Sequence, residues 1–306
     1  MTTVAALLGP TAAGKSAIAM ALARRFGAEI VSVDSMQVYR GMDIGTAKPT
    51  PQDRAAVPHH LIDIADPASP FSVAEFQRKG RSVLEDAVAR GHPVLIVGGS
   101  GLHFRALVDP LDFPPSSPTV RKEMEALDNA EAVSRLIAAD ASAGDHVDLA
   151  NPRRVSRALE VFALSGETPS SRAATPAAAA VREYRGLWPV VGIGVDPGGS
   201  LPGRIRQRFA AMLAAGLFDE VLALAPRLGL TAAQGVGYRE LLAVVRGDWT
   251  LEFATRRAIE ATTSLARRQR TFHRRDPRIR WLEWEDDEAA PVAQAATALE
   301  EAGWSS

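Results

Sequence analysis

The chain has 306 residues, 46% of them hydrophobic, and a formal net charge of −1. This length accommodates a large α/β core with a satellite domain, and the near-neutral charge excludes a polycation that binds nucleic acid along its whole length. The absence of cysteine excludes disulfides and thiolate zinc sites, and no run of about 18 apolar residues is long enough to cross a bilayer.

Five short apolar runs predict β-strands, namely Val4–Leu8, Ile30–Val33, Val94–Val97, Val190–Val195 and Ile279–Leu282. Amphipathic helical patterns lie between them, as in Lys15–Phe26 and Ser72–Arg90. Unbroken apolar strands that alternate with helices are typical of a parallel sheet buried on both faces. The pattern therefore predicts an α/β fold with a P-loop NTPase-like parallel sheet and helices on both faces.

A segment of different character interrupts this alternation at residues 113–185. It starts with DFPPSSP and ends with an Ala/Pro-rich stretch, and no convincing strand lies between. Helical patterns cover Thr119–Leu127, Glu131–Ala139 and Arg153–Leu164. We therefore expect an all-helical insertion domain at 113–185. Residues 1–112 and 186–306 would then form the catalytic core, with C-terminal helices that include Leu251–Arg275.

The first predicted strand leads directly into a phosphate-binding loop of the form G-x-x-x-x-G-K-S, followed by a helix. Backbone N–H groups of such a loop cradle phosphates at the positive end of the helix. Lys15 adds a charge, and the Ser16 hydroxyl can ligate Mg²⁺. The motif predicts polyphosphate binding without naming the ligand, by the residues Gly9, Pro10, Thr11, Ala12, Ala13, Gly14, Lys15 and Ser16.

The Mg²⁺-supporting Asp that ends a second strand in hydrolases of this class is missing. The best candidate strand ends in Gly98-Gly99-Ser100, and there is no obvious guanine-reading Asn-Lys-x-Asp segment. These absences argue against a standard ATPase or GTPase.

Asp34 ends a predicted strand that we place beside the strand of the phosphate loop, at the sheet edge where ligands bind. Its carboxylate can support Mg²⁺ through water or take a proton from a nucleophile. A helix cap or turn is the plainer interpretation of a single Asp.

The stretch DSMQVYRGMDIGTAKP at Asp34–Pro49 resembles the signature of the tRNA dimethylallyltransferases, also called tRNA isopentenyltransferases or IPP transferases. The absence of a C-terminal zinc finger corresponds to the bacterial type. Further motifs of that family follow in the same order over nearly the whole chain. They are PHHLIDI at Pro58–Ile64, VGGSGLHFRAL at Val97–Leu107, NPRRVSRALEV at Asn151–Val161, RIRQRF at Arg204–Phe209, GVGYRE at Gly235–Glu240 and ARRQRTF at Ala266–Phe272.

The resemblance implies transfer of a dimethylallyl group from dimethylallyl diphosphate to N6 of adenosine at tRNA position 37, beside the anticodon, with release of diphosphate. The substrate tRNAs would be those that read codons starting with U, and Mg²⁺ would be the cofactor. Asp34 would be the general base, which suits an adenine amine whose proton becomes acidic only as the new bond forms. Ser100, where the family usually has Thr, would contact the amine, and Arg208 would clamp the diphosphate. His103 stands where Tyr is common, and we interpret it as structural.

The resemblance also implies contacts with the anticodon stem-loop, partly from the insertion. Arg153, Arg154 and Arg157 follow Asn151-Pro152, a suitable start for a helix. We expect a cytoplasmic protein without a signal peptide or membrane contact, and take a monomer as the default. The tRNA-binding residues would be Asp34, Ser35, Met36, Gln37, Ser100, Arg121, Arg153, Arg154, Val155, Ser156, Arg157, Gln234, Gly235, Val236, Gly237, Tyr238 and Arg239.

Two other functions are compatible with the phosphate loop. A small-molecule kinase would use ATP, with Asp34 as the base. A nucleotide-regulated RNA-binding protein would need no catalytic base at all.

Overall fold

Within residues 4–284 and 289–304, which the computed structural model describes, six strands form one parallel sheet in the order β3-β2-β4-β1-β5-β6. This confirms the predicted α/β class. The two-residue strand β3 was not predicted, because two histidines carry no periodicity. The strands are β1 Val4–Leu8, β2 Glu29–Ser32, β3 His59–His60, β4 Val94–Gly98, β5 Val190–Gly194 and β6 Ile279–Trp281.

Two compact units make up the chain, residues 1–108 with 188–306 and residues 109–187. The first unit holds the sheet with α1 Lys15–Phe26, α2 Pro51–Ala56, α3 Val73–Ala89, α4 Gly101–Val108, α10 Leu201–Ala214, α11 Leu217–Leu224, α12 Tyr238–Val245, α13 Leu251–His273, α14 Ala289–Glu301 and the short 3₁₀ helices η2 Gly198–Ser200, η3 Ala225–Arg227 and η4 Ala232–Gln234. No single helix among the described residues is long and apolar enough to span a membrane, although the bent pair Gly198–Ala214 and Leu217–Arg227 passes the same test together.

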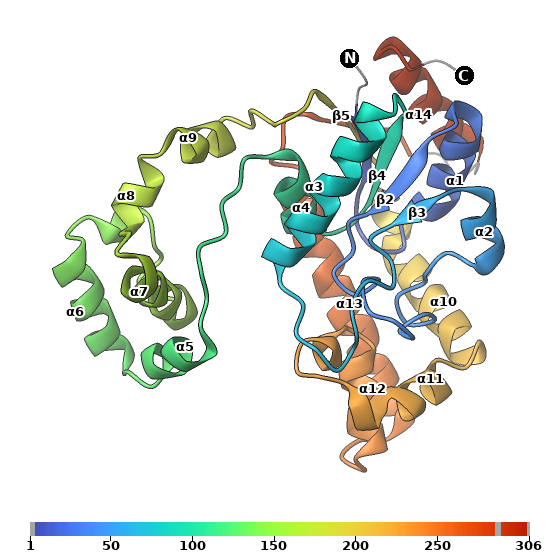
Figure 1. The fold of residues 1–306 in the computed structure, drawn as a ribbon. Helices are drawn as coiled ribbons and strands as arrows, with labels where there is room; N and C mark the ends of the chain where they lie inside the picture. The colour runs from blue at the N-terminus through green and yellow to red at the C-terminus, as the bar shows by residue number, and fades with distance from the viewer. Residues whose placement is uncertain (1–3, 285–288, 305–306) are drawn as a thin grey trace. The chain divides into compact units, whose positions relative to one another are not determined.

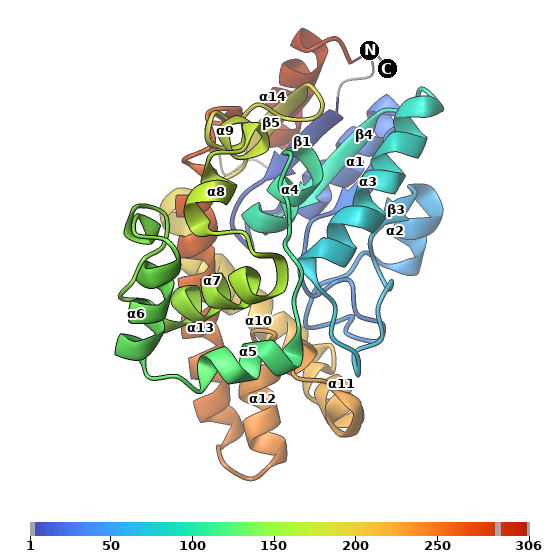
Figure 2. The ribbon, with the colours of Figure 1, turned by 60° about the vertical axis from the view of Figure 1, so that its left-hand side comes forward.

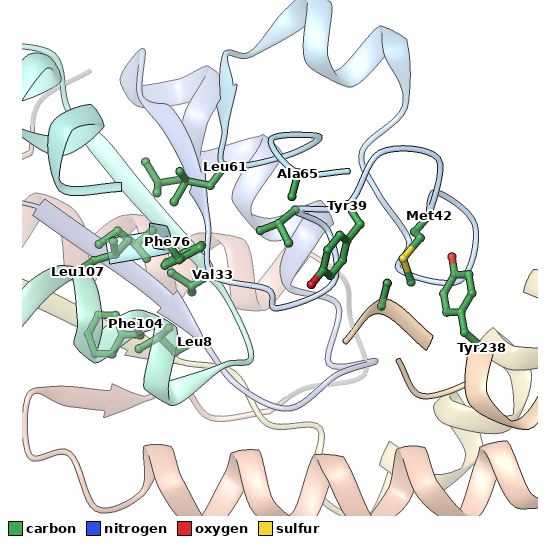
Figure 3. Packing of buried hydrophobic residues seen from close by; sticks show 14 of the residues in the cluster. Leu8, Val33, Tyr39, Met42, Leu61, Ala65, Phe76, Phe104, Leu107 and Tyr238 are labelled. Carbon is green, nitrogen blue, oxygen red and sulfur yellow. The ribbon is translucent and has the colours of Figure 1, made fainter. Parts of the chain in front are cut away.

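Alternate residues of the central strand β1 serve opposite faces of the sheet. Ala5 and Leu7 pack with α1 and α14, while Ala6 and Leu8 pack with α3 and α4 (Figure 1). Figure 3 shows the core on the side of the sheet that α3 and α4 cover, where Phe104 lies close to Leu8. Burial on both faces explains why β1 is an unbroken apolar run.

The strand order corrects one expectation. Asp34 follows β2, and β2 does not neighbour the phosphate-loop strand β1, because β4 pairs with both of them. The loop after β4, Gly99–Ser100, therefore lies between the phosphate loop and Asp34. All three segments leave the carboxyl-terminal edge of the same parallel sheet.

The second unit, residues 109–187, is entirely helical among its assigned elements, and residues 113–185 were the expected insertion. Its helices α5 and α6 each pack on α7, around Leu136 and Val155 (Figure 2). The Ala/Pro-rich end forms α9, and α8 precedes it. Neither helix was predicted, and each is started by a threonine cap followed by proline. The elements are α5 Pro118–Glu125, α6 Asn129–Ala139, η1 Ala143–Asp145, α7 Pro152–Ser165, α8 Pro169–Ala173 and α9 Pro176–Arg182.

A buried carboxylate ties this helical unit together. Glu160 on α7 accepts hydrogen bonds from Arg157 Nη1 at 2.7 Å, from Ser116 Oγ at 2.8 Å and from the Ser117 backbone N–H at 2.9 Å. Burial raises the pKa of Glu160, but these donors outweigh it and hold the pKa at about 2. The charge is therefore compensated inside the unit.

We expect Arg157→Ala to destabilise the protein by about 1.5 to 3 kcal/mol, because it removes a charged partner of a buried carboxylate. Since the folded-state pKa of Glu160 lies below its ordinary value of 4.5, its contribution is present above that value and is lost as pH falls toward 2. Urea unfolding between pH 2 and pH 7 measures both effects. Glu160→Gln is the control, and an equal acid dependence in that variant would contradict the assignment.

Candidate active site

The phosphate loop has the backbone of an anion cradle. Ala12 and Gly14 have φ angles of 64° and 86°, which turn neighbouring N–H groups inward. Gly9 has no room for a side chain, because a Cβ would lie 2.1 Å from the Val195 carbonyl oxygen. Arg204 Nε donates to the Ala12 carbonyl at 3.0 Å and holds this turn. The loop is thus braced against β5 and α10.

Lys15 begins α1, and its Nζ donates to the Pro10 carbonyl at 2.7 Å, across the mouth of the loop. Burial and the nearby Arg208 guanidinium lower the pKa of Lys15 to about 7, while Asp34 acts in the opposite direction. An anion bound in the loop would restore the charged form.

Asp34 serves as a turn residue and also lines the site. Its Oδ1 accepts the backbone N–H of Met36 at 2.8 Å and that of Gln37 at 3.3 Å. Both described hydrogen bonds use the same oxygen, so Oδ2 is the atom available to a substrate. The plainer interpretation of Asp34 as a turn residue is therefore also correct.

Ser100 is fixed beside Asp34 by the backbone. Its N–H donates to the carbonyl of Val33, the residue before Asp34, at 3.2 Å. Its Oγ lies 2.7 Å from Nδ1 of His103. The two glycines around Ser100 let α13 approach, since a Cβ on Gly99 would come within 2.4 Å of Gln269 Nε2.

Two cavities meet at Asp34 and Arg208. The phosphate cavity, of about 530 Å³, is lined by Lys15 and Ser16. The apolar cavity, of about 280 Å³, is lined by Ser100 and by the apolar side chains Ile205, Phe209, Met212, Leu217, Val236, Leu265 and Phe272, among others. Both cavities include Asp34 and Arg208 in their linings. A carboxylate and a guanidinium therefore stand where the two spaces join.

Arg208 has no hydrogen bond or ion pair within 4 Å among the residues that the structure describes, unlike Arg204, which donates to the Ala12 carbonyl, and unlike some arginines of α13. Arg270, for instance, pairs with Asp196 at 2.6 Å. Burial lowers the pKa of Arg208, and Asp34 raises it. Because a guanidinium keeps its charge, Arg208 presents an uncompensated cation to an incoming anion.

Gln269, which lines the site, and Glu220, which supports residues of its lining, were not singled out by sequence reasoning. Gln269 Oε1 accepts the Thr11 N–H of the phosphate loop at 2.8 Å, and Gln269 lines both cavities. Glu220 accepts the N–H groups of Asp43 and Ile44 and the hydroxyl of Tyr238. Gln269 lies inside the quoted motif ARRQRTF, but Glu220 has no motif that signals it.

The expected tRNA-binding residues of the first unit divide by exposure. Ser35, Met36, Val236, Gly237 and Tyr238 line the apolar cavity. Arg239 and Gln234 are exposed, and Gly235 is buried.

Gln37 has its side-chain amide engaged inside the protein. It accepts from Ser32 Oγ at 2.8 Å and donates to the carbonyls of Thr46 and Ala47. This side chain holds a loop, so we do not expect it to read RNA.

The expected tRNA-binding residues of the helical unit also divide. Arg153 and Arg154 are exposed at the start of α7. Val155 and Ser156 are buried, so their side chains support the helix and are not available to RNA. Arg157 donates to Glu160 and to two loop carbonyls, and Arg121 also reaches Glu160, at 3.4 Å.

Known proteins of similar sequence cover the whole chain. Proteins named tRNA dimethylallyltransferase from Streptomyces avermitilis and Bifidobacterium longum are 43% and 41% identical to it, over 97% and 98% of this chain and 96% and 92% of their own lengths. The solved tRNA delta(2)-isopentenylpyrophosphate transferase of Staphylococcus epidermidis superposes with a TM-score of 0.72 at 30% identity, covering 99% of this chain and 100% of that one. A eukaryotic dimethylallyltransferase acting on tRNA, at 23% identity and a TM-score of 0.83, shares the fold.

The fold and the site together define a P-loop α/β protein with a carboxylate at the junction of a phosphate cavity and an apolar cavity. The family model described as IPP transferase matches residues 37–276, and that described as isopentenyl transferase matches residues 2–63. The chain belongs to the IPP transferase family, that of the tRNA dimethylallyltransferases, which confirms the resemblance seen in its motifs.

The lowered pKa of Lys15 predicts a proton-linked diphosphate affinity. Above about pH 7 a growing fraction of Lys15 is neutral, and binding a diphosphate must reprotonate it. Affinity should therefore fall between about pH 7 and pH 9, with proton uptake on binding. Calorimetry in buffers of different ionisation enthalpy measures that uptake. Lys15→Met should bind more weakly without proton uptake, and equal uptake by both proteins would contradict the prediction.

Proposed function

We propose that this protein transfers the dimethylallyl group of dimethylallyl diphosphate to N6 of the adenosine at tRNA position 37. The observation that carries the proposal is the junction at which Asp34 and Arg208 line both the phosphate cavity and the apolar cavity. A group transfer from a diphosphate to a base needs one space for each partner and a proton acceptor between them. The names of the full-length relatives support the same activity.

The leaving group would lie in the phosphate loop. Lys15 and Arg208 supply two positive charges, and the loop supplies inward-turned N–H groups. When the C–O bond of the dimethylallyl diphosphate breaks, its electron pair remains on the diphosphate. These fixed charges stabilise the negative charge that develops there.

Magnesium fits this site as a partner of the diphosphate. Mg²⁺ in phosphate sites takes one or two protein oxygens and completes its shell with water and phosphate oxygens. Ser16 presents a hydroxyl to the phosphate cavity, which Asp34 also lines. The described residues contain no group of three acidic or histidine side chains that would hold a metal by itself. We propose that Ser16 supplies the protein ligand and that the ion neutralises charge on the leaving group.

The acceptor would be an adenine turned out of the anticodon loop, since a stacked base cannot reach a cavity at a sheet edge. Apolar side chains such as Phe209, Met212 and Phe272 suit a flat base and a five-carbon chain. The amine nitrogen attacks C1 of the allyl group, and Asp34 Oδ2 accepts the proton that the new C–N bond makes acidic.

One assay separates this function from its alternatives. Purified protein is mixed with dimethylallyl diphosphate, Mg²⁺ and an anticodon stem-loop, and the RNA is analysed by mass spectrometry. We expect a mass gain of one dimethylallyl group on the adenosine at position 37. Formation of ADP from ATP with a small acceptor, without RNA modification, would favour a kinase. RNA binding without any turnover would favour a non-enzymatic protein.

Replacing Asp34 by asparagine should lower the turnover rate by about two to four orders of magnitude, the usual contribution of a positioned base. The amide oxygen of the new side chain can still accept the N–H groups of Met36 and Gln37, so the turn and substrate binding should survive. Single-turnover kinetics with saturating RNA measures the chemical step. Asp34→Ala is the comparison, because it loses the turn as well. A loss of Mg²⁺ affinity with an unchanged chemical rate in Asp34→Asn would make Asp34 a metal ligand.

We propose that Arg153 and Arg154 bind tRNA phosphates, because both are exposed and neither is held by Glu160. Their double replacement by alanine should weaken tRNA binding and reduce its salt slope by about 0.7 for each lost single-strand contact. Dimethylallyl diphosphate binding should not change.

The matched control is Arg25→Ala with Arg280→Ala, which removes equal charge from two arginines paired with α14. Filter binding over a salt titration measures the slopes. If the two double variants change the tRNA affinity and the salt slope equally, Arg153 and Arg154 do not bind tRNA specifically.

A further inference from the structure

The contact between Ser100 and His103 is a feature of the site that the proposed reaction has not used. Ser100 ends the loop after β4, and His103 lies in the first turn of α4. The Oγ of Ser100 and the Nδ1 of His103 are 2.7 Å apart. The imidazole packs edge-on against Phe76, with ring centroids 4.5 Å apart at 82°. The ring is therefore held in place by the core and turned toward the serine.

The hydrogen-bonding capacity of Ser100 can be counted. A hydroxyl has one proton and two lone pairs. The backbone N–H of His103 points at Oγ from 3.5 Å, a long helix-cap contact that uses one lone pair weakly. If the proton is donated to Nδ1, one lone pair remains, and Ser100 lines the apolar cavity.

We propose that His103 is a positioning residue that accepts the Ser100 hydroxyl proton at Nδ1 and thereby makes Ser100 Oγ a hydrogen-bond acceptor for the target amine. The inference rests on the proposed function, in which an exocyclic amine enters this cavity. Burial lowers the pKa of His103, against the pull of Asp34, and so favours the neutral ring that such an acceptor requires.

The chemistry explains why an acceptor is needed there. An exocyclic amine carries two N–H groups, and its lone pair is free to attack only when the nitrogen leaves conjugation with the ring. Asp34 Oδ2 accepts one N–H and finally takes that proton. Ser100 Oγ accepts the other N–H, which fixes the direction of the lone pair toward the allyl carbon. A hydroxyl that rotated freely would donate as often as accept.

Four variants test the proposal through a double-mutant cycle: His103→Phe, His103→Asn, Ser100→Ala and the double variant Ser100→Ala/His103→Phe. Phenylalanine keeps the packing on Phe76 and removes the nitrogen, whereas asparagine places a carbonyl oxygen near the position of Nδ1. We expect His103→Phe to lower kcat by about 3- to 10-fold, the value of one hydrogen bond, with KM for dimethylallyl diphosphate unchanged. His103→Asn should restore most of the rate. In the Ser100→Ala background, His103→Phe should cause no further loss.

The outcomes separate a positioning role from a structural one. Additive losses in the double variant, or equal losses in His103→Phe and His103→Asn, would overturn the proposal. Nitrogen-15 NMR of the unaltered protein supplies an independent reading, in which we expect Nδ1 unprotonated and Nε2 protonated. A protonated Nδ1 would mean that His103 donates to Ser100, and this result would also overturn the proposal. If the unaltered protein fails to prenylate RNA, the proposed function fails, while the NMR measurement still decides the direction of this hydrogen bond.

Discussion

The position of β4 between β1 and β2 is the constraint on which the site depends. All three strands are parallel, so their carboxyl ends open at one edge of the sheet. β1 delivers the phosphate loop, β2 delivers Asp34, and β4 delivers Ser100 between them. The backbone bond from Ser100 N–H to the Val33 carbonyl continues the β2–β4 pairing one step past the strands. The positions of the base and of the hydroxyl are thus fixed by main-chain hydrogen bonds.

The second constraint on the site is an excess of positive charge among its side chains. Lys15 and Arg208 face a single carboxylate, Asp34, and each cation loses hydration by burial. The structure tolerates this arrangement because Lys15 can give up its proton near neutrality, while Arg208 cannot. A diphosphate with Mg²⁺ would supply the missing negative charge. The energetic cost of two partly buried cations would therefore be offset when such an anion binds, which would favour a multiply charged anion in the loop.

The parts of the molecule that are local in sequence could be predicted, and the parts that depend on distant contacts could not. The phosphate loop is contiguous, so its motif located both it and α1, which runs over Lys15–Phe26 as predicted. The prediction that β2 lies beside β1 was wrong, because the order of the strands depends on how the connecting helices cross the sheet. Gln269 was missed since its bond to Thr11 joins residues 258 positions apart. His103 was interpreted as structural, and its contact with Ser100 was not predicted because it depends on the turn that starts α4.

The helix α7 shows why residue type alone did not decide the role of its arginines. The run Arg153–Arg157 was expected to contact tRNA as a whole, but a helix turns about 100° at each residue, so five consecutive side chains cannot share one face. Val155 points into the core of the helical unit, and Arg157 lies three residues before Glu160, within reach of its carboxylate. Arg153 and Arg154 remain on the exposed side. Arg157 therefore has a structural role, which its buried acid partner one turn later identifies, whereas the exposed Arg153 and Arg154 lack that partner.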